Sequence, residues 1–258
     1  MPVVTLVEAT GTSASTTTGV ALAAAAPAGW QTLFAECDPS GGDLAAWAEL
    51  PETPGWMTSA SGGDRSWLGL QAHMQELPSG LSTLLAPCRA RVARTVVRES
   101  ATRFGPLLAS LSDVITVADC GRLDESPSPW LSSASLVLLL VRQAPLSAPA
   151  TVARVDRAAE VMERLARPDR RTGVVVIGAG PYDPSEVGVA VGGDLFGVLA
   201  EDPNGASQVG GAWTFGKGAG RSALLRSARP VAQAITDALV APSGGFSQVE
   251  ETSQEASG

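Results

Sequence analysis

The chain has 258 residues, a net charge of −8 at pH 7 and an apolar content of 45%. This length allows one large α/β domain or two small ones, each with a sizeable core. The negative charge argues against a nucleic-acid binder that works through a broad basic face.

The composition also restricts the chemistry. Lys217 is the only lysine and His73 the only histidine, so a histidine-based catalytic triad has at most one candidate. The cysteines Cys37, Cys88 and Cys120 fit no metal-ligand spacing and indicate a reducing compartment. No apolar run approaches the roughly 18 residues of a membrane span. The N-terminus lacks the charged start of a secretion signal, so we expect a cytoplasmic protein.

Apolar runs of strand length recur along the chain, and most are continuous rather than alternating. They span 3–9, 32–37, 81–86, 114–119, 136–141, 173–177 and 195–199. Helical patterns lie between them, at 17–26, 91–110, 149–166, 184–191 and 223–240. Continuous apolar runs are typical of strands that are covered on both faces. The alternation of strand and helix predicts a three-layer, doubly wound α/β fold with a mostly parallel sheet.

Residues 1–241 are predicted to form a single domain. Residues 51–80 are rich in proline and glycine, and we interpret them as an excursion with short helices after the second strand. Residues 242–258 are polar, acidic and rich in glycine and serine, so we expect a disordered tail.

Three motifs follow strands of the predicted sheet, where ligands of open parallel sheets gather. The first, ATGTSASTTT at 9–18, leads into a helix whose N-terminal N–H groups and dipole suit an anion. The others are ECDPSGGD at 36–43 and DCGR at 119–122. Mg²⁺ takes carboxylate, hydroxyl and phosphate oxygens, so Thr17, Asp38 and Asp119 are the predicted metal ligands.

The order of these motifs resembles that of the ParA/MinD family, P-loop ATPases with a deviant Walker A loop. VVTLVEATGTSASTTTGVALA resembles the first strand, phosphate loop and helix of that family, and ECDPSGGDLA resembles its switch I segment. VITVADCGRL is similar to the Walker B and switch II strand, and SASLVLLLVR to the strand after it. GDLFGVLAEDPNGASQVGG and GRSALLRSARPVAQAI resemble the late strand and the C-terminal helix. The similarity extends to about residue 241 and implies the P-loop NTPase, Rossmann-like fold.

The phosphate loop departs from the family pattern. Aligned on the threonine pair, the signature lysine falls on Gly11 and the P-loop lysine on Thr16, while the Mg²⁺-ligating threonine is retained as Thr17. The resemblance implies a nucleotide-binding loop of Gly11, Thr12, Ser13, Ala14, Ser15, Thr16, Thr17 and Thr18. Phosphoryl transfer depends on electrostatic stabilisation, and losing both lysines costs on the order of 3–4 kcal/mol. Ser13 and Ser15 also replace glycines that let backbone approach phosphate. We therefore expect weak or absent hydrolysis.

Positive charge near the nucleotide has other candidate sources. Arg122, Lys217 and Arg221 are candidate accessory phosphate contacts, and for Arg122 a surface ion pair is an equal alternative. GAWTFGKG at 211–218 matches a second P-loop pattern, but no apolar strand precedes it. Its plainer interpretation is a surface loop before a helix capped by Ser222. If the protein is an active ATPase, Asp38 is the expected catalytic residue of switch I.

The resemblance leaves two functions open. The first is a nucleotide-binding regulator or scaffold, weakly active or non-hydrolysing, for positioning or assembling a larger machine. Such degenerate members accompany Tad-type pilus or secretion ATPases in actinobacteria. The alternative is an active ATP-dependent positioning ATPase for chromosome partition or septum-site selection. Enzyme activity is undecided because both lysines are absent, and ATP or ADP with Mg²⁺ is as compatible with the sequence as no cofactor.

The implied partners are proteins of a secretion, pilus or partition system, and a homodimer is compatible with the family. The acidic, Gly/Ser-rich C-terminus replaces the basic amphipathic helix of membrane-binding members, so no direct membrane contact is expected. Nucleic acid is not expected as a partner. A Rossmann-type oxidoreductase is disfavoured, because Pro181 interrupts the helix start that would follow Gly178 and Gly180 in a G-x-G-x-x-G motif.

Overall fold

The computed structural model describes residues 2–11, 15–123, 128–167, 170–209 and 222–241. Within them, one eight-stranded sheet has the order β3-β4-β2-β5-β1-β6-β7-β8, parallel except for β3 at its edge. The strands are β1 (Val3–Glu8), β2 (Gln31–Glu36), β3 (Gln75–Glu76), β4 (Ser82–Leu84), β5 (Val114–Arg122), β6 (Leu136–Arg142), β7 (Arg171–Ile177) and β8 (Asp194–Leu199). The predicted doubly wound, mostly parallel α/β fold is therefore confirmed.

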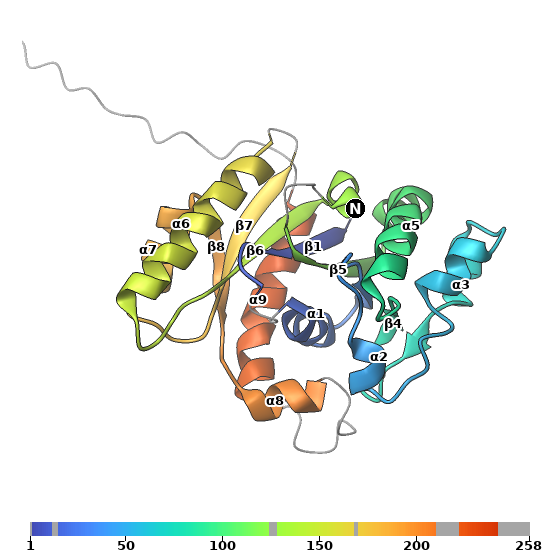
Figure 1. The fold of residues 1–258 in the computed structure, drawn as a ribbon, viewed down its shortest axis with the longest axis horizontal. Coiled ribbons are helices and arrows are strands. Elements are labelled where there is room, and N and C mark those ends of the chain that lie inside the picture. The colour runs from blue at the N-terminus through green and yellow to red at the C-terminus, as the bar shows by residue number, and fades with distance from the viewer. Residues whose placement is uncertain (1, 12–14, 124–127, 168–169, 210–221, 242–258) are drawn as a thin grey trace, which may run out of the picture.

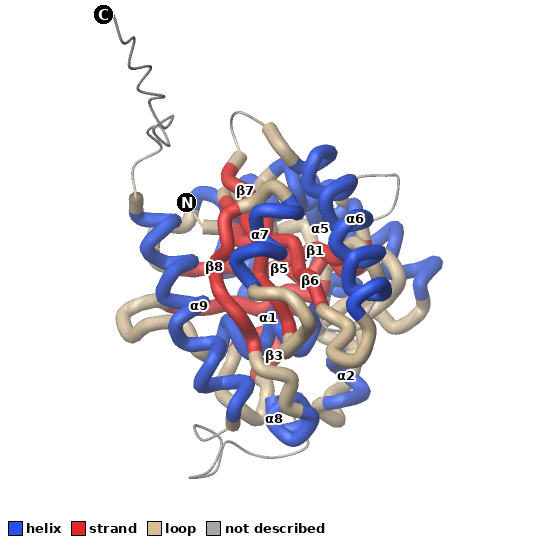
Figure 2. Tube along the Cα trace, turned by 90° about the vertical axis from the view of Figure 1, so that its left-hand side faces the viewer, coloured by secondary structure: helices blue, strands red, loops and turns tan. Residues whose placement is uncertain are grey.

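Helices cover both faces of this sheet (Figure 1). One face packs against α3 (Trp56–Ser61), α4 (Trp67–Gln71), α5 (Ala90–Ser110), the 3₁₀ helix η1 (Pro129–Ser132), α6 (Ala148–Leu165) and α7 (Pro184–Val191). The other packs against α1 (Ser15–Ala24), α2 (Leu44–Trp47), α8 (Pro203–Ser207) and α9 (Ala223–Val240). Figure 2 shows the edge strand β8 between α9 and α7.

The central strands are largely apolar because each supplies both layers of the core. In β1, Val3 and Val7 belong to the cluster under α5 and α6, whereas Val4 and Leu6 belong to the cluster under α1 and α9. Successive side chains of a strand point to opposite faces, so a strand covered on both sides has no polar face. The continuous apolar runs in the sequence follow from this burial.

All seven predicted strands and all five predicted helices are present. The first helix begins two residues earlier than predicted, at Ser15, and the excursion at 51–80 contains α3, α4 and β3. The sequence patterns missed β3, α2, η1 and α8, each five residues or shorter. No described helix is both long enough and apolar enough to cross a membrane. The predicted tail at 242–258 lies outside the described residues.

Candidate functional site

Three buried carboxyl groups lie at the C-terminal edge of the sheet, on three neighbouring strands. Glu36 ends β2, Asp119 lies near the end of β5, and Glu8 ends β1. Each side chain is only 2% exposed, and Glu36 lies beside Asp119 in the β2–β5 register. Burial without hydrogen bonds would be costly for such groups, so the partners of each carboxyl group define the site.

Glu8, at the end of β1, accepts a hydrogen bond from the start of the first helix. Its Oε1 accepts the backbone N–H of Ser15, the first residue of α1, at 2.7 Å. The N–H groups at a helix N-terminus are the groups that bind phosphate in a phosphate loop. Here a carboxyl oxygen of the chain itself takes one of them. The sequence patterns place Glu8 only in a strand region, and the available signal for its role is an acidic residue that ends a buried strand directly before the loop.

Asp119 holds the loop from the neighbouring strand. Its Oδ2 accepts the hydroxyl of Thr16 at 2.6 Å, and its Oδ1 accepts the N–H of Gly121 at 3.0 Å. Burial raises the pKa of Asp119 to about 6, opposed by hydrogen bonds from Thr16, Ser15 and Gly121. Thr16, which stands where the resemblance places the P-loop lysine, therefore directs its side chain at a carboxyl group of the protein.

Glu36 fixes the segment that follows β2. Its Oε1 accepts the N–H of Leu44 and its Oε2 that of Ala86, both at 2.9 Å. Burial raises the pKa of Glu36 to about 7, against the effect of these hydrogen bonds. A Cβ on Gly42 would lie 2.3 Å from Glu36 Oε2, so that position has no room for a side chain. Glu36 thus joins the loop after β2 to the loop after β4.

Asp38 and Arg122 lie close to this network. Asp38 Oδ1 accepts the N–H of Ser40 at 2.6 Å, and its charge contributes to the raised pKa of Asp119. Asp38 can come this close only because residue 121 is a glycine, at φ +60°. A Cβ on Gly121 would lie 2.0 Å from Asp38 Oδ2. Arg122 Cδ lies 3.8 Å from the position that a Cβ on Gly11 would take, which places this arginine beside the loop.

Thr17 and Thr18 line a different space. They border a cavity of about 260 Å³ together with residues of β7, the loop after β8 and α9. Arg142 and Glu201, which form an ion pair, also line it. Asp38 therefore lies near Asp119, because both contact Gly121. Thr17 instead borders the 260 Å³ cavity.

The arrangement gives little support to a bound Mg²⁺–nucleotide. Among the described residues, no group of three or more histidine, cysteine, aspartate or glutamate side chains could hold a metal ion. Both oxygens of Asp119 already accept hydrogen bonds, and Glu8 accepts the helix N–H. These carboxyl oxygens therefore already have partners within the protein, and the ligand set Thr17, Asp38 and Asp119 stays a prediction.

Several of the predicted contacts cannot be placed. Thr12, Ser13 and Ala14 of the loop lie outside the described residues, as do the accessory candidates Lys217 and Arg221. Arg122 is described, and its position beside Gly11 is compatible with a phosphate contact. The nucleotide-binding role of the loop therefore stays a prediction.

Comparison with known proteins gives the fold. No family model and no curated protein matches the sequence. Among solved structures, the ParA family ATPase from Chlorobium tepidum TLS superposes with a TM-score of 0.69 over 90% of this chain and 97% of its own, at 15% identity. This chain has the ParA/MinD fold. The resemblance that the motifs indicated is thus confirmed at the level of the fold.

Two further structures with the ParA/MinD fold broaden the comparison. The septum site-determining protein MinD from Pyrococcus horikoshii OT3, complexed with Mg-ADP, has a TM-score of 0.66 at 14% identity, covering 90% of this chain and 94% of its own. The MinC:MinD complex from Aquifex aeolicus has a TM-score of 0.65 at 14% identity, covering 92% and 96%. At such low identities the similarity shows a shared fold and nothing more.

Proposed function

We propose that this chain is a regulator or scaffold with the ParA/MinD fold that does not hydrolyse nucleotide. The observation that carries the proposal is the hydrogen bond from the Ser15 N–H to Glu8 Oε1. A phosphate group needs the N–H groups at this helix start and the positive end of the helix dipole. A buried carboxyl group in that place both takes a donor and adds negative charge where phosphate would approach.

The second support is the loss of positive charge from the loop. Catalysis of phosphoryl transfer comes almost entirely from positioning and from electrostatic stabilisation of the transferring group. Gly11 and Thr16 stand at the two lysine positions implied by the resemblance, and the Thr16 hydroxyl is bonded to Asp119. The alternative, an active positioning ATPase for partition or septum-site selection, is disfavoured because it requires these charges from elsewhere.

A protein without hydrolysis acts through what it binds. One structural neighbour is a MinD bound to another protein, MinC, which supports proteins as the partners of this fold. We therefore propose that the chain contributes to the positioning or assembly of a larger machine of secretion or pilus type. In this proposal it acts in the cytoplasm and contacts protein partners, or a second copy of itself, rather than membrane or nucleic acid.

The decisive experiment measures Mg²⁺-dependent nucleotide binding and turnover by the full chain. Calorimetry with ATP and with ADP is run with and without Mg²⁺, followed by an assay of phosphate release. We expect no Mg²⁺-dependent binding tighter than about millimolar and no phosphate release above the rate without protein. Micromolar Mg²⁺-dependent binding with measurable turnover would instead establish an active switch and overturn the proposal.

A further inference from the structure

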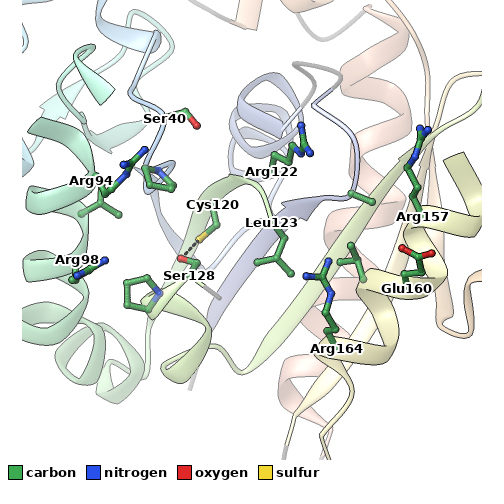
Figure 3. Close-up of a pocket in the computed structure, with 15 residues that line it drawn as sticks. Ser40, Arg94, Arg98, Cys120, Arg122, Leu123, Ser128, Arg157, Glu160 and Arg164 are labelled. Atoms are coloured by element: carbon green, nitrogen blue, oxygen red, sulfur yellow. Dashed lines mark hydrogen bonds between the residues drawn. The ribbon is translucent and has the colours of Figure 1, made fainter. Parts of the chain in front are cut away.

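A cavity of about 760 Å³ opens at the C-terminal ends of β1 and β5, between α5 and α6 (Figure 3). It lies on the face of the sheet opposite to α1, because α5 and α6 pack on one core cluster and α1 on the other. Val97, Leu123 and Val161 supply apolar surface to its lining. This size is within the range of small-molecule sites.

Arginine side chains dominate the charged part of this lining. The cavity is lined by Arg94 and Arg98 of α5, Arg122 of β5, and Arg157 and Arg164 of α6. The spacings of four and seven residues place each helical pair on one face of its helix. In Figure 3 the two pairs lie on opposite sides of the cavity, with Arg122 between them. Glu160 is the one acidic residue among the described lining residues.

Three of these arginines do not hold the described part of the chain together through their side chains. Arg94, Arg98 and Arg157 are exposed, and none of their guanidinium groups has a hydrogen bond or ion pair with another described residue. Arg154 differs, since its guanidinium donates to the backbone carbonyls of Arg142 and Gln143. Arg122 and Arg164 have further interactions, so the inference rests on the other three.

The positive lining continues beyond this cavity. A second cavity of about 370 Å³ shares Leu123 and Arg164 with the first and adds Arg167 and Arg170. Seven of the seventeen arginines of a chain with net charge −8 therefore line two adjoining cavities. Low-dielectric walls that carry charge of one sign focus the local potential, whatever the net charge of the whole protein.

The lining determines the chemistry of a ligand. Guanidinium groups bind phosphate oxygens in pairs, and a phosphate monoester carries nearly two negative charges near pH 7. Because arginines lie on two facing helices, a ligand that satisfies both must carry at least two separate anionic groups. The apolar part of the lining suits the uncharged portion of such a molecule.

We propose that this arginine-lined cavity binds a small molecule of nucleotide size that carries at least two phosphate groups. This site lies on the face of the sheet opposite to α1, although Ala9 and Arg122 of its lining border the loop, and its binding does not require Mg²⁺. The concave space between α5 and α6, open to solvent on one side, distinguishes it from the flat basic face expected of a nucleic-acid binder.

Calorimetry with inorganic tripolyphosphate, without Mg²⁺, tests this site on the full chain. The double variant Arg94→Gln/Arg157→Gln removes one guanidinium from each wall. Arg65→Gln/Arg226→Gln is the matched control, because both residues are exposed, lie outside the cavity lining and change the net charge equally. We expect the affinity to fall at least about tenfold in the first variant and less than about twofold in the control.

Three results would overturn the proposal. They are no binding of tripolyphosphate up to about millimolar, equal loss of affinity in both double variants, or tighter arginine-dependent binding of a polyglutamate peptide or a DNA duplex. Since the substituted residues are exposed, equal thermal unfolding of all variants is expected and is checked first; if the double variant unfolds, Arg157→Gln alone is used. Magnesium-free binding and phosphate release are separate readouts, so this site and the proposed lack of hydrolysis fail independently.

Discussion

At the C-terminal edge of the sheet, charged side chains are buried on one face and exposed on the other. On the α1 side, Glu8, Glu36 and Asp119 are buried and accept N–H and hydroxyl donors of their own chain. On the side of α5 and α6, Arg94 and Arg157 are exposed, and their guanidinium groups bond to no described residue. The net charge of −8 describes neither side, so it is a poor guide to what this protein binds.

The difference follows from solvent access. A buried carboxyl group must find hydrogen-bond partners within the protein, so its donors are committed to holding loops in place. An exposed guanidinium is solvated by water at little cost and remains able to bind an incoming anion. We therefore expect acidic-side substitutions to change stability and basic-side substitutions to change binding.

The largest expected effect is the loss of stability on removing Glu36. Glu36→Ala leaves the buried N–H groups of Leu44 and Ala86 without acceptors, which should lower the free energy of unfolding by about 3 kcal/mol. Arg94→Ala, the exposed counterpart, should change it by less than about 0.5 kcal/mol. Urea unfolding measures both. Similar losses in the two variants would remove the distinction between the two sides.

The next effect concerns the blocked helix start. In the double variant Glu8→Ala/Thr16→Lys the Ser15 N–H is free and the loop regains a positive charge. We expect its affinity for Mg-ADP to rise about a hundredfold over the unmodified chain, equivalent to about 2.7 kcal/mol. Thr16→Lys alone is the control and should gain much less. If the single variant gains as much, Glu8 is not what blocks the loop; if neither gains, the assignment of the loop is wrong.

A smaller effect is expected where the acidic side is most tightly packed. Gly121→Ala combines a positive φ with a Cβ that would overlap Asp38, so we expect a loss of about 2 kcal/mol or more in the free energy of unfolding. Gly29→Ala is the matched control, at φ +100° with no atom within 4 Å of the added Cβ. It should lose about 1 kcal/mol. Equal losses would mean that the contact with Asp38 is easily relieved.

The last effect, spread over several pH units, is a pH dependence that only the acidic side should show. The pKa values of Asp119 and Glu36, about 6 and about 7 in the folded chain, exceed their usual values of 3.8 and 4.5. The folded chain therefore holds protons that the unfolded chain has released, and stability falls as the pH rises from about 4 to about 7.

Urea unfolding at several pH values in this window measures that slope. We expect the free energy of unfolding to decrease by on the order of 1 kcal/mol per pH unit. Glu36→Gln should make the decrease shallower, whereas Arg157→Gln should leave it unchanged. Stability that increases with pH across this window would contradict burial as the cause of the raised pKa values.

The sequence was sufficient for the fold but for only part of the site. Runs such as 136–141 are apolar at every position, which both predicts a strand and requires helices on its two faces. By contrast β3 has two residues, Gln75 and Glu76, and no pattern to detect. The strand-end position of Asp119 was predictable from the order of the motifs.

The roles of Glu8 and of the arginines depend on tertiary contacts that no local pattern encodes. Glu8 ends β1 and Ser15 begins α1, and only the packing of α1 against the sheet brings the two together. Arg94 and Arg157 belong to helices separated by two strands in the chain, and only the folded sheet places them on facing walls of one cavity. Net charge, the quantity available from the sequence, averages over both sides of the sheet edge.

The strand order also has a consequence for how the chain is made. β1 lies between β5 and β6 in the sheet, so it has no neighbouring strand until residues 114–122 have been synthesised, and its second edge is paired only by residues 136–142. Until then, the segment VVTLVE has two largely apolar faces and two unpaired edges. The nascent chain therefore carries an unpaired, aggregation-prone strand while all the residues between β1 and β5 are made.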